Sequence, residues 1–221
     1  MPATRPLPAA AVFDWDGTIV DTLSMIYRAN VVALAPIGIS MTREWFRTGY
    51  TPDWRRSYRE LGVPEDRWDE VSARWAAEMA TMRPRAMPWA RGALRRLRRH
   101  GIRVGLVTAS TRGVVLPNLA RLHLEHVFEV AVYADQVTDG KPHPEGLLRA
   151  LDELGIAPAD TVYVGDTTVD FEMARAAGAR FAAVGTTTSV EDFRAAGVGR
   201  VWPGVGAWAD DLLGVDRNPG S

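Results

Sequence analysis

Two aspartates one residue apart, Asp14 and Asp16, end a short apolar run near the start of the chain. The small, apolar and β-branched residues over 9–13 predict a buried parallel strand that runs out into a tight loop. Alternate residues of an extended chain lie on one side, so both carboxylates face the same space and Trp15 faces away. Because neighbouring carboxylates repel one another, one must be protonated or a cation must lie between them.

Gly17 and Thr18 follow directly and complete an Asp-x-Asp-Gly-Thr segment. The glycine allows a turn whose backbone N–H groups face that same space, an arrangement that suits an anion. Carboxylates, a cation and an anion together indicate metal-assisted chemistry on a phosphate. Taken alone, the segment leaves two alternatives open, a polar turn after a strand and a calcium-binding loop.

The composition excludes several classes of protein. The 221 residues suffice for one large domain or for a domain with a moderate insertion. The absence of cysteine excludes disulfides, thiol catalysis and Cys-ligated zinc. A formal net charge of −1 gives no reason to expect nucleic acid or a membrane as a partner, and no apolar run is long enough to span a bilayer. We expect a cytoplasmic protein, as a monomer or a homodimer.

Lys141 is the single lysine among 26 basic residues, and Pro142 follows it. The arginine bias of the other basic residues says little about any one of them. A compact ammonium group at one position indicates a place where a planar guanidinium would not fit.

Residues 22–88 differ in pattern from the rest of the chain. Their apolar residues recur at helical spacing, and prolines and glycines divide them into about four helices with no obvious strand. We interpret this segment as a helical domain inserted into a core made of residues 1–21 and 89–221.

From residue 89 onward, helices alternate with short apolar strands. This alternation predicts an α/β core, a parallel sheet covered by helices on both faces. After the first strand, the expected strands span residues 104–107, 127–132, 161–164, 180–184 and 201–202. The expected helices span residues 91–100, 112–123, 145–154, 171–177 and 208–213.

Four loops at or after the ends of these strands carry polar side chains. The carboxyl ends of parallel strands share one edge of a sheet, so the four loops can converge there. Four acids would then meet one lysine and one threonine, an excess of negative charge that favours a hard divalent cation held by oxygen atoms. The lysine and the threonine would hold phosphate oxygens. The residues concerned are Asp14, Asp16, Asp166, Asp170, Thr108 and Lys141.

These loops resemble the four sequence motifs of the haloacid dehalogenase superfamily, in its phosphoglycolate phosphatase-like branch with a helical cap after the first strand. The matching segments are Asp14–Thr18, Thr108, Lys141–Pro142 and Gly165–Asp170. The resemblance covers essentially the whole chain, with the insertion at the position of the cap. It implies a Rossmann-like core, a cap domain over 22–88 and a Mg²⁺-dependent phosphatase acting on a small phosphorylated metabolite.

The resemblance also implies roles for individual residues. Asp14 would be the nucleophile that forms an aspartyl-phosphate, Asp16 would protonate the leaving alcohol and then act as base, and Lys141 would neutralise charge on the nucleophile and the phosphate. The residues implied for magnesium are Asp14, Asp16 through its backbone carbonyl, Asp166 and Asp170. The residues implied for phosphate and substrate are Trp15, Gly17, Thr18, Thr108, Ala109, Lys141 and, in the insertion, Arg47 and Tyr50.

One position departs from the pattern of the branch. Ala109 stands where an asparagine usually follows the threonine, and Ser110 or Arg112 is a candidate to replace its amide. Other functions stay open: a phosphosugar mutase or a pyrophosphatase of the same branch, or a non-catalytic metabolite-binding module on the same scaffold. The carboxylate of Asp16 favours phosphate chemistry, because dehalogenating relatives lack it.

Overall fold

A computed structural model describes residues 6–49 and 54–215, without the side chains of Arg47 and Thr48. The chain divides into two compact units. The first consists of Met1–Asp21 and Arg85–Ser221, and the second of Thr22–Pro84.

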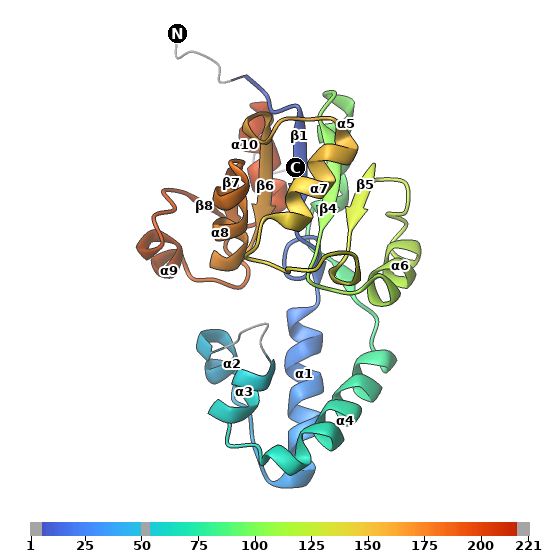
Figure 1. Ribbon diagram of the computed structural model, residues 1–221, viewed down its shortest axis with the longest axis vertical. Helices are drawn as coiled ribbons and strands as arrows, with labels where there is room; N and C mark the ends of the chain where they lie inside the picture. The colour runs from blue at the N-terminus through green and yellow to red at the C-terminus, as the bar shows by residue number, and fades with distance from the viewer. Residues whose placement is uncertain (1–5, 50–53, 216–221) are drawn as a thin grey trace, which may run out of the picture. The chain divides into compact units, whose positions relative to one another are not determined.

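A parallel sheet forms the centre of the first unit. In the described part of the chain it has six strands, in the order β5-β4-β1-β6-β7-β8. The strands are β1 Ala10–Phe13, β4 Arg103–Val107, β5 Val130–Val132, β6 Thr161–Gly165, β7 Arg180–Val184 and β8 Val201–Trp202. Because β1 pairs with β4 on one side and β6 on the other, the first motif follows a central strand (Figure 1).

Helices cover both faces of this sheet, which confirms the predicted fold class (Figure 1). They are α5 Ala90–Arg99, α6 Arg112–Arg121, α7 Glu145–Leu154, α8 Thr168–Ala177, α9 Val190–Ala195 and α10 Val205–Leu213. Ala11 and Phe13 of β1 pack in one core cluster with α5, α6 and α10. Ala10 and Val12 pack in a second cluster with α7 and α8. Alternate side chains of β1 therefore pack against helices on opposite faces of the sheet.

The helix expected over 171–177 begins earlier, at Thr168, because Thr167 and Asp170 form a capping box. The hydroxyl of Thr167 accepts the N–H of Asp170 at 3.2 Å, and Oδ2 of Asp170 accepts the N–H of Thr167 at 3.1 Å. This cap fixes the carboxylate of Asp170 at the first turn of α8.

A short antiparallel ladder that the sequence pattern did not predict joins β2 (Val20–Asp21) to β3 (Arg85–Ala86). Arg85 and Ala86 lie between Pro84 and Pro88 and form no apolar run, unlike the equally short strand Val201–Trp202, which the pattern does predict. Both strands belong to the first unit, so the chain returns to this unit at Arg85 rather than at residue 89.

The second unit is helical in its described residues. Its helices are α1 Leu23–Leu34, α2 Arg43–Gly49, α3 Trp54–Glu60 and α4 Trp68–Thr81. Helix α1 packs against α4, and Ala33, Leu34 and Val71 are fully buried in their shared cluster. None of the helices in the described segments of either unit is both long and apolar enough to cross a membrane.

Candidate active site

The loop after β1 is closed by its own backbone. The N–H of Gly17 donates to the carbonyl of Val20 at 2.9 Å, so this N–H is engaged inside the loop. Gly17 has a φ of 77°, and a Cβ at this position would collide with the carboxylate of Asp166. Both the backbone conformation and the close approach require glycine here.

Three other N–H groups of the loop are not engaged in this way. Those of Trp15, Asp16 and Thr18 have no hydrogen-bond acceptor among the residues that the structure describes. The side chain of Trp15 is fully buried and packs with Ile19 in the core of the first unit. Free backbone donors on a loop anchored in the core form a turn that can hold an anion.

Lys141 joins two of the predicted acids. Its Nζ lies 2.5 Å from Oδ1 of Asp14 and 2.8 Å from Oδ1 of Asp170. The side chains of Lys141 and Asp14 are each 9% exposed, and that of Asp170 is 1% exposed. The single lysine of the sequence therefore lies between carboxylates from the first and fourth motifs.

Asp166 is held by two hydroxyl groups. Thr18 donates to Oδ1 at 2.7 Å, and Thr187 donates to Oδ2. Thr187 was not among the predicted site residues. A signal for it exists, because a run of three threonines over 186–188 follows the strand at 180–184 after a single glycine and therefore lies at the carboxyl edge of the sheet.

Asp14, Asp166 and Asp170 form a buried carboxylate cluster whose oxygens lie within 4.8 Å of one another. Burial raises the pKa of Asp14 well above its ordinary value against the opposing charge of Lys141, and Asp170 and Asp166 add to the rise. Burial, assisted by Asp170, raises the pKa of Asp166 to about 7. Burial alone would lower the pKa of Lys141, but the charges of Asp14 and Asp170 outweigh it and raise this pKa. Three acids against one ammonium leave excess negative charge that a divalent cation would offset.

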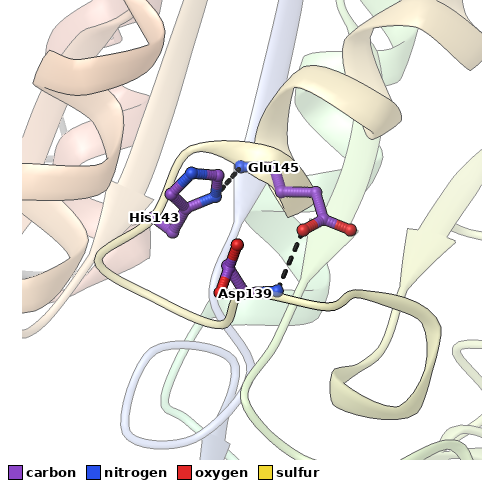
Figure 2. A group of neighbouring side chains, drawn as sticks. All are labelled: Asp139, His143 and Glu145. Carbon is purple, nitrogen blue, oxygen red and sulfur yellow. Dashed lines mark hydrogen bonds between the residues drawn. The ribbon is translucent and has the colours of Figure 1, made fainter.

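A second group of possible metal ligands consists of Asp139 and His143, in the loop that carries Lys141, and Glu145, the first residue of α7 (Figure 2). Both carboxylate oxygens of Glu145 accept backbone N–H groups, those of Thr138 and Asp139, at 2.9 Å. These bonds lower the pKa of Glu145, and its own N–H donates to Nδ1 of His143 at 3.3 Å. These hydrogen bonds connect the loop that carries Lys141 to the first turn of α7.

Thr108, Ala109 and Lys141 line a cavity of about 150 Å³. The hydroxyl of Thr108 accepts the N–H of Ser110 at 2.9 Å, which leaves its proton for another acceptor. Ser110 in turn donates its own hydroxyl to Oδ2 of Asp16 at 2.6 Å. Of the two candidates to replace the asparagine amide, the serine contacts the first motif.

The predicted residues of the insertion fall outside what the structure describes. Tyr50 is not described, and Arg47 is placed in α2 without its side chain. Their contacts with a substrate stay predictions.

Comparison with known proteins identifies the family. Residues 11–184 match the haloacid dehalogenase-like hydrolases. The chain is 32% identical over 193 residues to phosphoglycolate phosphatase 1 of Pseudomonas aeruginosa, covering 82% of this chain and 71% of that protein. It is 30% identical over 186 residues to the phosphorylated carbohydrates phosphatase of Thermotoga maritima, covering 76% of this chain and 81% of that protein.

A solved structure shares both fold and sequence with this chain. The crystal structure of CbbY from Rhodobacter sphaeroides in complex with phosphate superposes with a TM-score of 0.70 at 25% identity, covering 90% of this chain and 96% of that chain. The family match confirms the resemblance and the enzyme class expected from the motifs. The chain belongs to the haloacid dehalogenase-like hydrolases.

Proposed function

We propose that this hydrolase is a Mg²⁺-dependent phosphatase of a small, phosphoglycolate-like metabolite, and that it works through an aspartyl-phosphate on Asp14. The observation that carries the proposal is the buried ion pair of Asp14 with Lys141 beside Asp166 and Asp170. The relatives named as phosphatases of phosphoglycolate and of phosphorylated carbohydrates support the substrate class.

The donor set of the cluster fits magnesium. Asp14, Asp166 and Asp170 offer carboxylate oxygens in a buried site, and Mg²⁺ prefers oxygen ligands shared with a substrate phosphate. Burial raises the pKa of Asp14 and of Asp166, and a bound cation would favour the ionised form of both carboxyl groups. When bound, the ion would neutralise charge on the phosphate and the nucleophile.

The reaction consists of two phosphoryl transfers, the first to Asp14 and the second to water, and Asp16 exchanges a proton in each. A carboxylate oxygen of Asp14 forms a bond to phosphorus while the bond to the leaving oxygen breaks, and Asp16 gives its proton to that oxygen. In the second transfer Asp16 takes a proton from water, and the water oxygen attacks the same phosphorus. The bond to Asp14 then breaks, which releases inorganic phosphate and returns the carboxylate.

Lys141 and the loop donors hold the phosphate during both transfers. The ammonium of Lys141 offsets the negative charge that would otherwise repel a phosphate from Asp14. The N–H groups of Trp15 and Thr18 and the free hydroxyl proton of Thr108 are available to its oxygens. We further propose that the helical unit Thr22–Pro84 acts as a cap that selects the leaving group.

The test is phosphate release from a panel of phosphate esters and pyrophosphate, with and without Mg²⁺, by the wild type and Asp14→Asn. We expect release that requires Mg²⁺ and is lost in Asp14→Asn, with phosphoglycolate among the better substrates. Equal inactivity of both proteins across the panel would refute hydrolysis. Isomer interconversion of phosphosugars would then be assayed for a mutase.

A further inference from the structure

Ser110 links the loop after β4 to the loop after β1. Its Oγ donates a hydrogen bond of 2.6 Å to Oδ2 of Asp16, and both residues belong to the first unit. The contact therefore joins a serine with no assigned role to the acid that lies beside the nucleophile.

The backbone of Ser110 is fixed on both sides. Its N–H donates to Oγ1 of Thr108 at 2.9 Å, and its carbonyl accepts the N–H of Ala134 at 3.1 Å. The hydroxyl thus extends from a turn tied to its own strand end and to the segment after β5. A donor fixed in this way can hold its acceptor in one orientation.

The two oxygens of the Asp16 carboxylate differ in their contacts. Oδ2 accepts the hydroxyl of Ser110, whereas Oδ1 has no hydrogen-bond partner among the residues described. A serine hydroxyl can donate to one oxygen of a carboxyl group whether or not the other oxygen carries a proton. The same contact can therefore persist while Asp16 gives up a proton and takes it back.

We infer that Ser110 is a positioning residue for Asp16: it holds Oδ2 and leaves Oδ1 to exchange the proton with the leaving oxygen and with water. This inference rests on the proposed function, since it needs Asp16 as the acid and base. It also gives the departure at Ala109 a consequence. Ala109 cannot make the contact of the asparagine amide that is usual at this position. Ser110, one residue later, makes a side-chain contact instead, and its partner is Asp16.

The first test compares leaving groups in Ser110→Ala. An alkyl phosphate needs its leaving oxygen protonated, whereas p-nitrophenyl phosphate has a leaving group that departs with little assistance. Loss of one hydrogen bond to the carboxyl group of Asp16 predicts a fall of about tenfold in the single-turnover rate of alcohol release from the alkyl ester, with a change of less than about threefold in single-turnover release of p-nitrophenol and in KM. Ser110→Thr, which keeps the hydroxyl, should recover most of the alkyl activity. An equal loss on both esters, or a loss confined to KM, would overturn the inference.

The second test is a double-mutant cycle in single-turnover release of the alcohol from the alkyl phosphate. If Ser110 acts through Asp16, Ser110→Ala should have no further effect in an Asp16→Asn background. If the double variant instead loses rate by the product of the two single-variant factors, Ser110 acts independently of Asp16, and the inference is overturned. A wild type without Mg²⁺-dependent phosphatase activity would refute the proposed function and this inference together. An active wild type that is indifferent to Ser110→Ala would refute only the inference.

Discussion

The Nζ atom of Lys141 lies 2.5 Å from Oδ1 of Asp14, and each side chain is 9% exposed. A buried pair of this kind differs from a surface ion pair, because removal of one partner leaves the other charge without solvent or counterion. The pair therefore affects both the stability of the first unit and the reactivity of Asp14.

Lys141→Met should lower both the catalytic activity and the stability of the protein. We expect activity to fall by about 10² to 10³-fold, because the phosphate and Asp14 would then face one another without an intervening cation from the protein. In EDTA the free energy of unfolding should fall by about 3 kcal/mol, measured by urea denaturation. Arg149→Met is the control, since its pair with Glu153 is about half exposed and should contribute less than about 1 kcal/mol. A Lys141→Met protein that behaves like this control would contradict the prediction.

The hydroxyl groups of Thr18 and Thr187, which donate to the carboxylate of Asp166, should increase the affinity of the site for magnesium. Thr18→Val and Thr187→Val each remove one hydrogen bond to this carboxylate, and we expect each to weaken Mg²⁺ binding by about tenfold. Isothermal titration without substrate measures this directly. Ser189→Ala removes a hydroxyl that caps α9 through Asp192, and should lower stability while leaving Mg²⁺ affinity unchanged. Unaltered affinity in both valine variants would refute this role for the hydroxyls.

The metal-free protein should lose stability as pH rises. The pKa of Asp166 rises from 3.8 to about 7 in the folded protein, so its stabilising contribution is complete below about pH 4 and is lost as pH rises through 7. We expect a fall on the order of 3 kcal/mol between pH 4 and 8 in EDTA, read from thermal or urea unfolding. Added Mg²⁺ should restore more stability at pH 8 than at pH 5, because protons compete at the lower pH. Asp166→Asn should flatten most of this dependence; an unchanged slope would contradict it.

Gly165 at the end of β6 should tolerate no side chain. A Cβ there would lie 2.6 Å from Cβ of Asp170, so Gly165→Ala must displace the carboxylate that contacts Lys141. We expect a loss of about 2 kcal/mol in stability and at least about tenfold in activity. Gly113→Ala is the matched control, because it lies in α6 with no neighbour within 4 Å of the new Cβ and should raise stability by about 0.5 kcal/mol. Equal behaviour of the two variants would refute the steric argument.

The sequence predicts those site residues whose type and position after an apolar strand are distinctive by themselves. Asp14, Asp166 and Asp170 follow apolar strands directly or within one helical turn, so the parallel sheet alone predicts their convergence. Lys141 was identifiable as the single lysine, although its loop leaves an edge strand.

The parts that could not be predicted depend on turn geometry. Thr187 is one of three consecutive threonines, and the sequence does not say which hydroxyl reaches Asp166. Likewise Ser110 and Arg112 were equal candidates, because the choice depends on how Thr108 closes the turn. Strand β3 was missed because Arg85 and Ala86 form no apolar run, whereas β7 and the equally short β8 were predicted with their exact bounds from apolar residues.

The pairing of β1 has a consequence for the synthesis of the protein on the ribosome. One of its two partners, β6, spans Thr161–Gly165, so a nascent chain exposes one side of its first strand until most of the polypeptide has left the ribosome. An open edge on an apolar strand is a template for aggregation, and chaperones would be needed most during this interval. A chain that stops before Asp166 would carry Asp14 but lack two of the three clustered carboxylates. Premature fragments should therefore be prone to aggregate and inert toward cellular phosphates.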